Sequence, residues 1–238
     1  MYKSGTYTCR IDGTAVSYQL TKRKRQKYVN IKISRAGEVR VSAPNGASLS
    51  HIENVLHQKS GWILKHTQTA HTMLQKFDPE TSVLYFGKRY PVKVEYNSAC
   101  KKNKVLIKNN KIVVEKNNSD TTLTLKCIGD FLEKEARTEI SKKIEQYAGL
   151  MGITYNRIAF RSQKTRWGSS SGKGNLNFNW RIIMAPDKVQ NYLVIHELGH
   201  QKHRNHSHAF WDFVSYWCPE YKECDTWLKN HAVILGLF

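Results

Sequence analysis

The motif HELGH at residues 196–200 constrains the fold of this chain more than any other part of its sequence. Residues four positions apart lie on one face of a helix, so His196 and His200 can bind one metal ion together. Glu197, between them, can reach a water molecule on that ion. Because the preceding run 191–195 is apolar, the motif predicts a buried metal-binding helix. The alternative is a solvated helix with two incidental histidines.

A third protein ligand would hold the metal and leave a fourth position open for water. His206 follows His200 at the spacing of zinc proteases whose helix breaks after the second histidine and turns back to the metal. Asn205 tolerates the left-handed backbone that such a turn needs, and Ser207 suits the first position of a new helix. His206 is therefore the first candidate. The alternatives are His203 or His208, and an acidic ligand from Glu220 or Glu223.

A second group of polar residues spans residues 161–170, where three cations lie beside an indole and a glycine. The guanidinium group of Arg166 suits fork-like recognition of carboxylate or phosphate oxygens, and we expect it to stabilise negative charge during a reaction. The alternative is a solvated basic strand whose Trp167 is in the core. The candidate substrate-binding residues are Arg161, Lys164, Trp167 and Asn179.

The formal net charge of +19 is unevenly distributed. Residues 1–120 carry 22 basic and 8 acidic side chains, whereas residues 121–238 carry 16 and 11. Such a field favours an anionic partner, such as nucleic acid or phosphate, and a basic surface without a specific ligand fits equally well. A polar run at residues 116–120 marks the expected boundary between a basic, β-rich N-terminal region, 1–120, and a catalytic domain, 121–238.

Hydrophobic patterning predicts hairpins around residues 28–41, 83–94 and 105–114, and a helix from Ser48 or Ser50 with a break near Gly61. Apolar residues at helical spacing from Thr121 to Gly149 predict a long amphipathic helix. Short strands follow, and then the metal-binding helix, a helix from Ser207 and a final helix over 219–231. The fold class is therefore α+β.

The five cysteines are odd in number and widely spaced, so we expect reduced thiols in a cell. No signal peptide is recognisable at the N-terminus. No apolar run approaches the roughly 18–20 residues that cross a bilayer. The expectation is a soluble, cytoplasmic protein that does not contact a membrane, and the sequence leaves its oligomeric state open.

Several further motifs resemble those of the YgjP-like family of predicted metal-dependent hydrolases, relatives of the SprT-like and minigluzincin metallopeptidases. The resemblance covers nearly the full length and rests on KTRWGS at 164–169, NFNWR at 177–181, Ala185-Pro186, HELGH at 196–200 and NHSHAFW at 205–211, with Gly61-Trp62-Ile63. It departs at Ser170, near which a Cys is often seen, and at Gly199, where small residues vary. Neither departure affects the expected ligands.

The resemblance implies His196, His200 and His206 as metal ligands and Glu197 as catalytic base. It also implies a zincin-like core, composed of an active-site helix, a small antiparallel sheet and backing helices, behind a β-rich N-terminal region. Zinc is the expected metal, although imidazole ligands also suit Ni²⁺ and other divalent ions such as Mg²⁺ or Mn²⁺.

The predicted activity is hydrolysis of peptide bonds by metal-activated water, with Glu197 as general base and Arg166 or a nearby histidine stabilising the developing charge. A peptide substrate is expected to lie antiparallel to the strand 175–180 if that strand is a sheet edge. One alternative is a metal-dependent nucleoside triphosphate pyrophosphatase that binds phosphates with Arg161, Lys164 and Arg166. Another is a nucleic-acid-associated protein, which charge alone supports.

Overall fold

The computed structural model describes residues 3–34, 37–98, 103–117, 121–163 and 165–238. The chain divides into two compact units, residues 1–77 and 78–236. Within the described ranges, every helix is too short or too polar to pass through a membrane. Of the cysteines in those ranges, Cys9, Cys127, Cys218 and Cys224 are free thiols. Cys100 lies outside the described residues.

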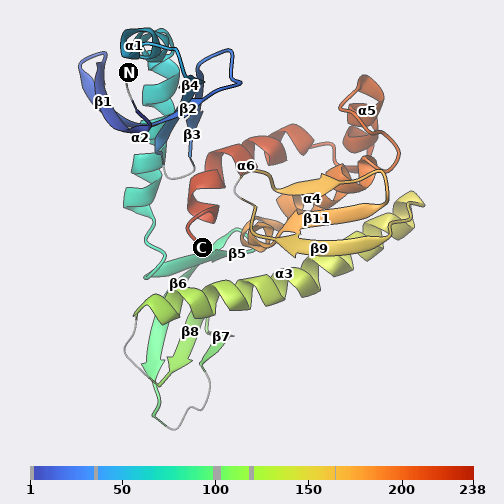
Figure 1. Cartoon of the computed structure of the whole chain (residues 1–238). Coiled ribbons are helices and arrows are strands. Elements are labelled where there is room, and N and C mark those ends of the chain that lie inside the picture. The colour runs from blue at the N-terminus through green and yellow to red at the C-terminus, as the bar shows by residue number, and fades with distance from the viewer. Residues whose placement is uncertain (1–2, 35–36, 99–102, 118–120, 164) are drawn as a thin grey trace. The chain divides into compact units, whose positions relative to one another are not determined.

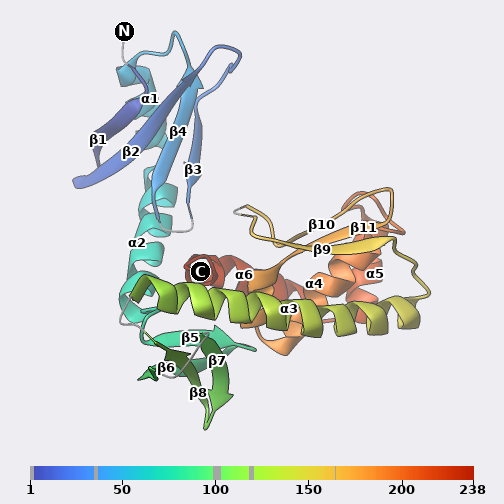
Figure 2. The same cartoon turned by 60° about the horizontal axis from the view of Figure 1, so that its bottom comes forward.

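The first unit is a four-stranded sheet with two helices (Figures 1 and 2). Its elements are β1 (Gly5–Ile11), β2 (Thr14–Arg23), β3 (Asn30–Ile33), β4 (Val39–Pro44), α1 (Leu49–Gln58) and α2 (Ser60–Lys76). The strand order is β1-β2-β4-β3, in which β2 and β4 are parallel and the other pairs are antiparallel. One face of the sheet forms the core with α1, through buried side chains such as Val16, Tyr18, Val41, Ile52 and Leu56.

Two local signals explain the turns of this unit. The Asp12-Gly13 turn between β1 and β2 has positive φ at both residues, 47° and 80°, which is the geometry of a two-residue hairpin. The Ser48 side chain accepts a hydrogen bond from the backbone of His51 and begins α1. The helix predicted from Ser48 is two helices, and the break falls at Lys59 rather than at Gly61.

The second unit contains two sheets and four α-helices in the described ranges. The first sheet is made of β5 (Ser82–Tyr85), β6 (Lys88–Tyr96), β7 (Lys104–Lys108) and β8 (Lys111–Lys116), in the order β5-β6-β8-β7. The second is made of β9 (Arg157–Arg161), β10 (Gly168–Ser170) and β11 (Asn175–Asn179), in the order β10-β11-β9. The helices are α3 (Thr121–Met151), α4 (Asp187–Gly199), α5 (His208–Trp217) and α6 (Tyr221–Leu235), with a 3₁₀ helix η1 (Trp180–Met184) before α4.

Helix α3 is the long amphipathic helix that the sequence predicts. Its 31 residues give a length of about 46 Å. A fully buried stripe repeats at every fourth position through Ile128, Leu132, Ala136, Ile140 and Ile144. Figures 1 and 2 both place α3 between the β5–β8 sheet and the layer that contains β9, β11 and α4. Helix α3 packs on η1, α4, β7, β8 and β9, and its buried stripe is part of the core of the second unit.

The α+β class is confirmed, and the sheet beside α4 is more complex than a small antiparallel sheet. Strand β11 pairs antiparallel with β10 and parallel with β9. The compact units also divide at a different place from the boundary expected at residue 120. Because β5 to β8 pack against α3, these strands belong to the second unit.

Candidate metal centre

Helix α4 carries HELGH at its C-terminal end and lies almost entirely in the core. Asp187 occupies its first turn, where a negative charge favours the positive end of the helix dipole. Gln190 is fully buried, and its side-chain amide donates to the carbonyl oxygens of Ile183 and Ala185 at 3.2 and 2.7 Å. This contact ties the start of α4 to η1, so the motif is held on a rigid support.

The chain turns back towards α4 directly after the motif. His200 caps the C-terminus of α4, and the next helix, α5, begins after Ser207. As a result, His196, His200 and His206 each bring one ring nitrogen into a group whose members lie within 4.8 Å of one another. The Nε2 atoms of His196 and His206 are 3.2 Å apart. Two ligands of one tetrahedral zinc ion, each about 2.0–2.1 Å from it, stand roughly 3.3 Å apart, so the three imidazoles fit such an ion.

Neighbouring groups fix the orientation of these rings. The Nδ1–H of His200 donates to the carbonyl oxygen of His203 at 3.0 Å, which leaves Nε2 free to act as a ligand. Phe210 stacks on the His200 ring with centroids 4.5 Å apart, and Trp211 stacks on His206 at 5.5 Å. These aromatic side chains were not among the predicted site residues, although Phe210 follows His206 at helical spacing in the sequence.

Burial keeps the motif histidines neutral. Desolvation, followed by the nearby charges that His200 and His206 would carry, lowers the pKa of His196 to about 3. Desolvation also lowers the pKa of His200. The Nδ1 atom of His196 is buried without a hydrogen-bond partner among the described residues. A metal ion binds the neutral form of imidazole. The lowered pKa values of these two rings therefore favour binding of a metal ion over binding of a proton.

Glu197 follows His196 in α4 and is 4% exposed. Its Oε2 atom has no hydrogen-bond partner within the described part of the chain. Burial raises the pKa of this carboxyl to about 8, and the positive charge of Arg166 acts against that shift. A buried carboxylate with one unsatisfied oxygen is costly unless a cation or a proton compensates it.

The sheet beside α4 places β10 next to Glu197. An added Cβ at Gly168 would stand 2.6 Å from Cδ of Glu197, so any larger residue at this position would displace the Glu197 side chain. The side chain of Gln201, just after α4, also hydrogen-bonds to the Ser170 hydroxyl. Gly168 was not predicted as a site residue, and its place within KTRWGS was its only sequence signal.

The remaining predicted residues lie in different surroundings. Arg161 is exposed at the end of β9, Arg166 is exposed in the loop before β10, and Trp167 is half-buried against the core. Lys164 lies outside the described residues. Asn179 is fully buried, and its amide donates to the carbonyl oxygens of Gln163 and Arg166 at 2.7 and 3.4 Å. It therefore holds the loop that carries Arg166.

The alternative third ligands are turned to other contacts. The His203 ring packs against Phe213, and the exposed His208 pairs with Asp212 at 2.6 Å. Glu220 precedes α6 as its N-cap residue, and Glu223 faces Lys188 at 3.5 Å. Among the described residues, the group that could hold a metal ion at this site consists of His196, His200 and His206.

Two imidazoles at the end of one helix, a third from the turn after it, and a buried glutamate in the same helix are the parts of a metal-dependent hydrolase. The chain is an enzyme of this class. More specifically, the chain belongs to the YgjP-like family, because a model of the YgjP-like metallopeptidase domain matches residues 27–231. The crystal structure of the metallopeptidase zymogen of Pyrococcus abyssi abylysin is similar to part of the chain. The two are 24% identical with a TM-score of 0.35, over 38% of this chain and 93% of abylysin. No curated protein gives a significant match.

Proposed function

We propose that the protein hydrolyses peptide bonds with a divalent cation, zinc in the first instance, held by His196, His200 and His206. The observation that carries this proposal is the convergence of the three ring nitrogens at the end of α4, the helix that also carries the buried carboxylate of Glu197. When bound, the cation supplies a Lewis acid that lowers the pKa of water to about 7 and polarises a carbonyl group.

Glu197 acts as the general base in this proposal. Its carboxylate accepts a proton from the attacking water and delivers that proton to the leaving nitrogen. A cation at the imidazoles would favour the ionised carboxylate and so offset the effect of burial on its pKa. Arg166 lies close enough to influence Glu197 and is exposed, so it can stabilise negative charge on the attacked carbonyl oxygen.

The substrate backbone pairs with β10 in this proposal. We expected a peptide beside the strand 175–180 if it were a sheet edge, but β11 is the central strand and β10 is at the edge. The backbone of Asn179 donates to the carbonyl oxygen of Trp167, and that of Ser171 donates to Asn175. Because alternate residues face the partner strand, Gly168 and Ser170 turn their backbone groups to the outer edge. An extended peptide can bond to them next to Glu197.

The test is an assay of the purified, zinc-loaded chain with unfolded casein and, separately, with a panel of nucleoside triphosphates. We expect peptide fragments from casein, no phosphate or pyrophosphate release, and loss of cleavage in Glu197→Gln with zinc retained. Glu220→Gln, at an exposed glutamate before α6, is the matched control. Pyrophosphate release that depends on Glu197 would instead support the alternative that uses Arg161, Lys164 and Arg166.

A further inference from the structure

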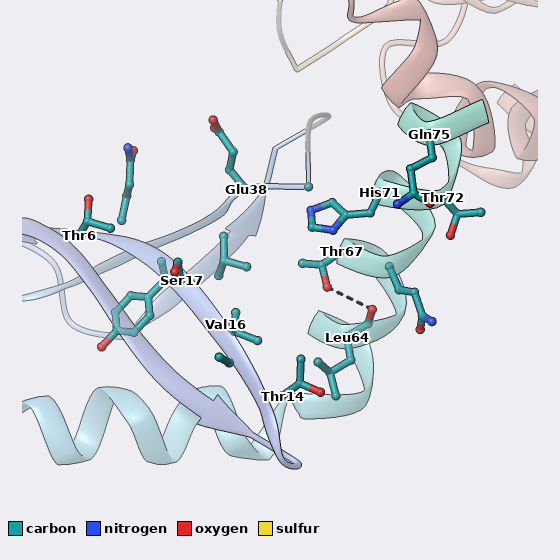
Figure 3. Close-up of a pocket in the computed structure, with 16 residues that line it drawn as sticks. Thr6, Thr14, Val16, Ser17, Glu38, Leu64, Thr67, His71, Thr72 and Gln75 are labelled. Atoms are coloured by element: carbon teal, nitrogen blue, oxygen red, sulfur yellow. Dashed lines mark hydrogen bonds between the residues drawn. The ribbon is translucent and has the colours of Figure 1, made fainter. Parts of the chain in front are cut away.

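The first unit contains a cavity of about 820 Å³, whereas the candidate metal centre belongs to the second unit. Its walls are β2, the end of the turn before β4 at Gly37 and Glu38, and one side of α2 (Figure 3). Every lining residue lies between Thr6 and Gln75, so the cavity is complete within the first unit. Its volume is typical of a ligand-binding site.

One wall of the cavity is the part of β2 whose edge does not pair with β4. Strand β2 pairs with β1 from Thr14 to Leu20, but β4 begins its pairing opposite Tyr18. In a hairpin with a two-residue turn, the flanking pair Ile11 and Thr14 exchanges backbone hydrogen bonds. Alternation then turns the N–H and C=O of Ala15 and the N–H of Ser17 away from β1, towards the cavity. An uncovered strand edge of this kind is a template for another extended chain.

The helix wall is a single face of α2. The lining residues are Leu64, Thr67, Gln68, His71, Thr72 and Gln75, at the spacing of one helix face. This face is about 16 Å long, since it covers eleven residue steps of 1.5 Å. About five residues of an extended chain have the same length. The strand edge and the helix face therefore bound a channel that fits a short extended segment.

The lining groups suit a polypeptide. Hydroxyl groups from Thr14, Ser17, Thr67 and Thr72 and amides from Gln19, Gln68 and Gln75 can satisfy polar backbone and side-chain atoms, while Val16 and Leu64 add apolar surface. Residues 1–77 contain 13 Lys and Arg against 3 Asp and Glu, so the unit attracts acidic chains. The exposed Arg10 is the cross-strand partner of the small residue Ala15, beside the channel.

We propose that this cavity binds an extended, acidic polypeptide segment, which adds to the sheet beside Ala15 and Ser17 in the position that β4 leaves uncovered. The backbone edge supplies affinity, and the face of α2 selects side chains that fit between strand and helix. Binding here is separate from hydrolysis, and its test does not depend on the proposed function.

The test uses the full chain, a chelator to prevent cleavage, and a fluorescein-labelled ten-residue peptide of alternating Val and Thr with Glu at both ends. Thr67→Trp fills the channel from α2. Thr69→Trp is its matched control, because Thr69 is exposed, lies outside the cavity and bonds to the carbonyl four residues earlier, as Thr67 does. Fluorescence anisotropy should show at least a roughly tenfold weaker Kd for Thr67→Trp and little change for Thr69→Trp.

Two further measurements address the strand edge and the charge. Ser17→Pro removes the outward N–H at a position where proline leaves the β1 ladder intact, and it should weaken binding as well. Bound peptide should slow hydrogen exchange at Ala15 and Ser17. Arg10→Glu should weaken binding more than Lys59→Glu, which makes the same charge change at an exposed site between α1 and α2.

Several outcomes would overturn the proposal. They include equal affinity of the two Trp variants, each folded by circular dichroism, and no peptide binding by the unmodified chain at about 1 mM, the weak limit of specific recognition. A concentration-dependent dimer that Thr67→Trp disrupts would assign the cavity to a second copy of the chain. An oligodeoxythymidine that competes with the peptide and is equally sensitive to Thr67→Trp would assign it to nucleic acid.

Discussion

Gly168 and Glu197 are in direct contact across the interface between β10 and α4. A Cβ on Gly168 would stand 2.6 Å from Cδ and 2.7 Å from Cγ of Glu197. The edge strand therefore approaches the Glu197 side chain so closely that a side chain at position 168 would displace it. The position of the proposed base depends on a residue that carries no side chain.

Gly168→Ala is expected to displace the Glu197 carboxylate and to lower kcat by about 100-fold, since misplacement by about 1 Å has that effect on well-oriented groups. Zinc affinity should stay within a few-fold, because the atoms nearest to a Cβ at Gly168 belong to Glu197 and not to an imidazole. Gly149→Ala in α3 is the control, because an added Cβ there meets nothing within 4 Å. Casein cleavage and zinc titration measure both effects. A fully active Gly168→Ala enzyme would show that the carboxylate position is unimportant.

Glu197→Gln should make stability less sensitive to pH in the metal-free protein. Burial raises the pKa of Glu197 from 4.5 to about 8, so the folded state keeps a proton that the unfolded chain loses in this interval. Stability is therefore lost as pH rises from about 4.5 through 8. The variant should match the parent near pH 4.5 and exceed it above pH 8 by roughly 1–3 kcal/mol, the usual cost of an unsatisfied buried group. Urea unfolding with a chelator measures this, and an equal difference at both pH values would contradict it.

His206→Ala is expected to weaken zinc binding by at least about 100-fold, since loss of a group that only hydrogen-bonds to a metal ligand already costs about 10–100-fold. His208→Ala is the matched control, because His208 lies two residues away, is exposed and pairs with Asp212. Competition with a zinc chelator measures both affinities. Similar affinities for the two variants would exclude His206 as a ligand.

Asn179→Ala should release the loop that carries Arg166. Its buried amide donates to two backbone carbonyls, which would be left unsatisfied, so we expect a loss of roughly 1–3 kcal/mol in stability. We also expect kcat to fall more than zinc affinity, because Arg166 would lose its position. Asn177→Ala is the control on the same strand, because the Asn177 amide makes a single hydrogen bond, of 3.3 Å, to the Ser169 hydroxyl. Thermal unfolding and casein assays of both variants provide the comparison.

Local signals predicted the elements of the fold well. The spacing of Ile128, Leu132 and Ala136 was sufficient to predict α3, because a buried stripe needs only the helical period. The hairpins of the second unit, β5 with β6 and β7 with β8, were also predicted, and both are confirmed. The pairing of β9 with β11 was not predicted, because parallel strands meet through long connections that leave no local pattern.

In the candidate site too, local contacts could be predicted from the sequence and contacts between distant segments could not. Helical spacing placed His196 and His200 together, and the motif continued to His206, so the cluster could be predicted from about ten residues. The contact of Gly168 with Glu197 joins segments almost thirty residues apart and depends on how β10 packs on α4. The contacts of Asn179 could not be predicted either. The sequence alone does not distinguish an asparagine that bonds to distant backbone from one that faces a substrate.

The turn after α4 has a consequence for how this chain can vary in length. His200 ends one helix and Ser207 precedes the next, and only five residues separate His200 from His206 in the turn that returns His206 to the other two histidines. Inserting or deleting one residue there would rotate or shift the His206 imidazole away from His196 and His200, because so short a turn cannot absorb the change. Related chains that keep the chemistry should therefore conserve the number of residues between these histidines even where the residues themselves differ.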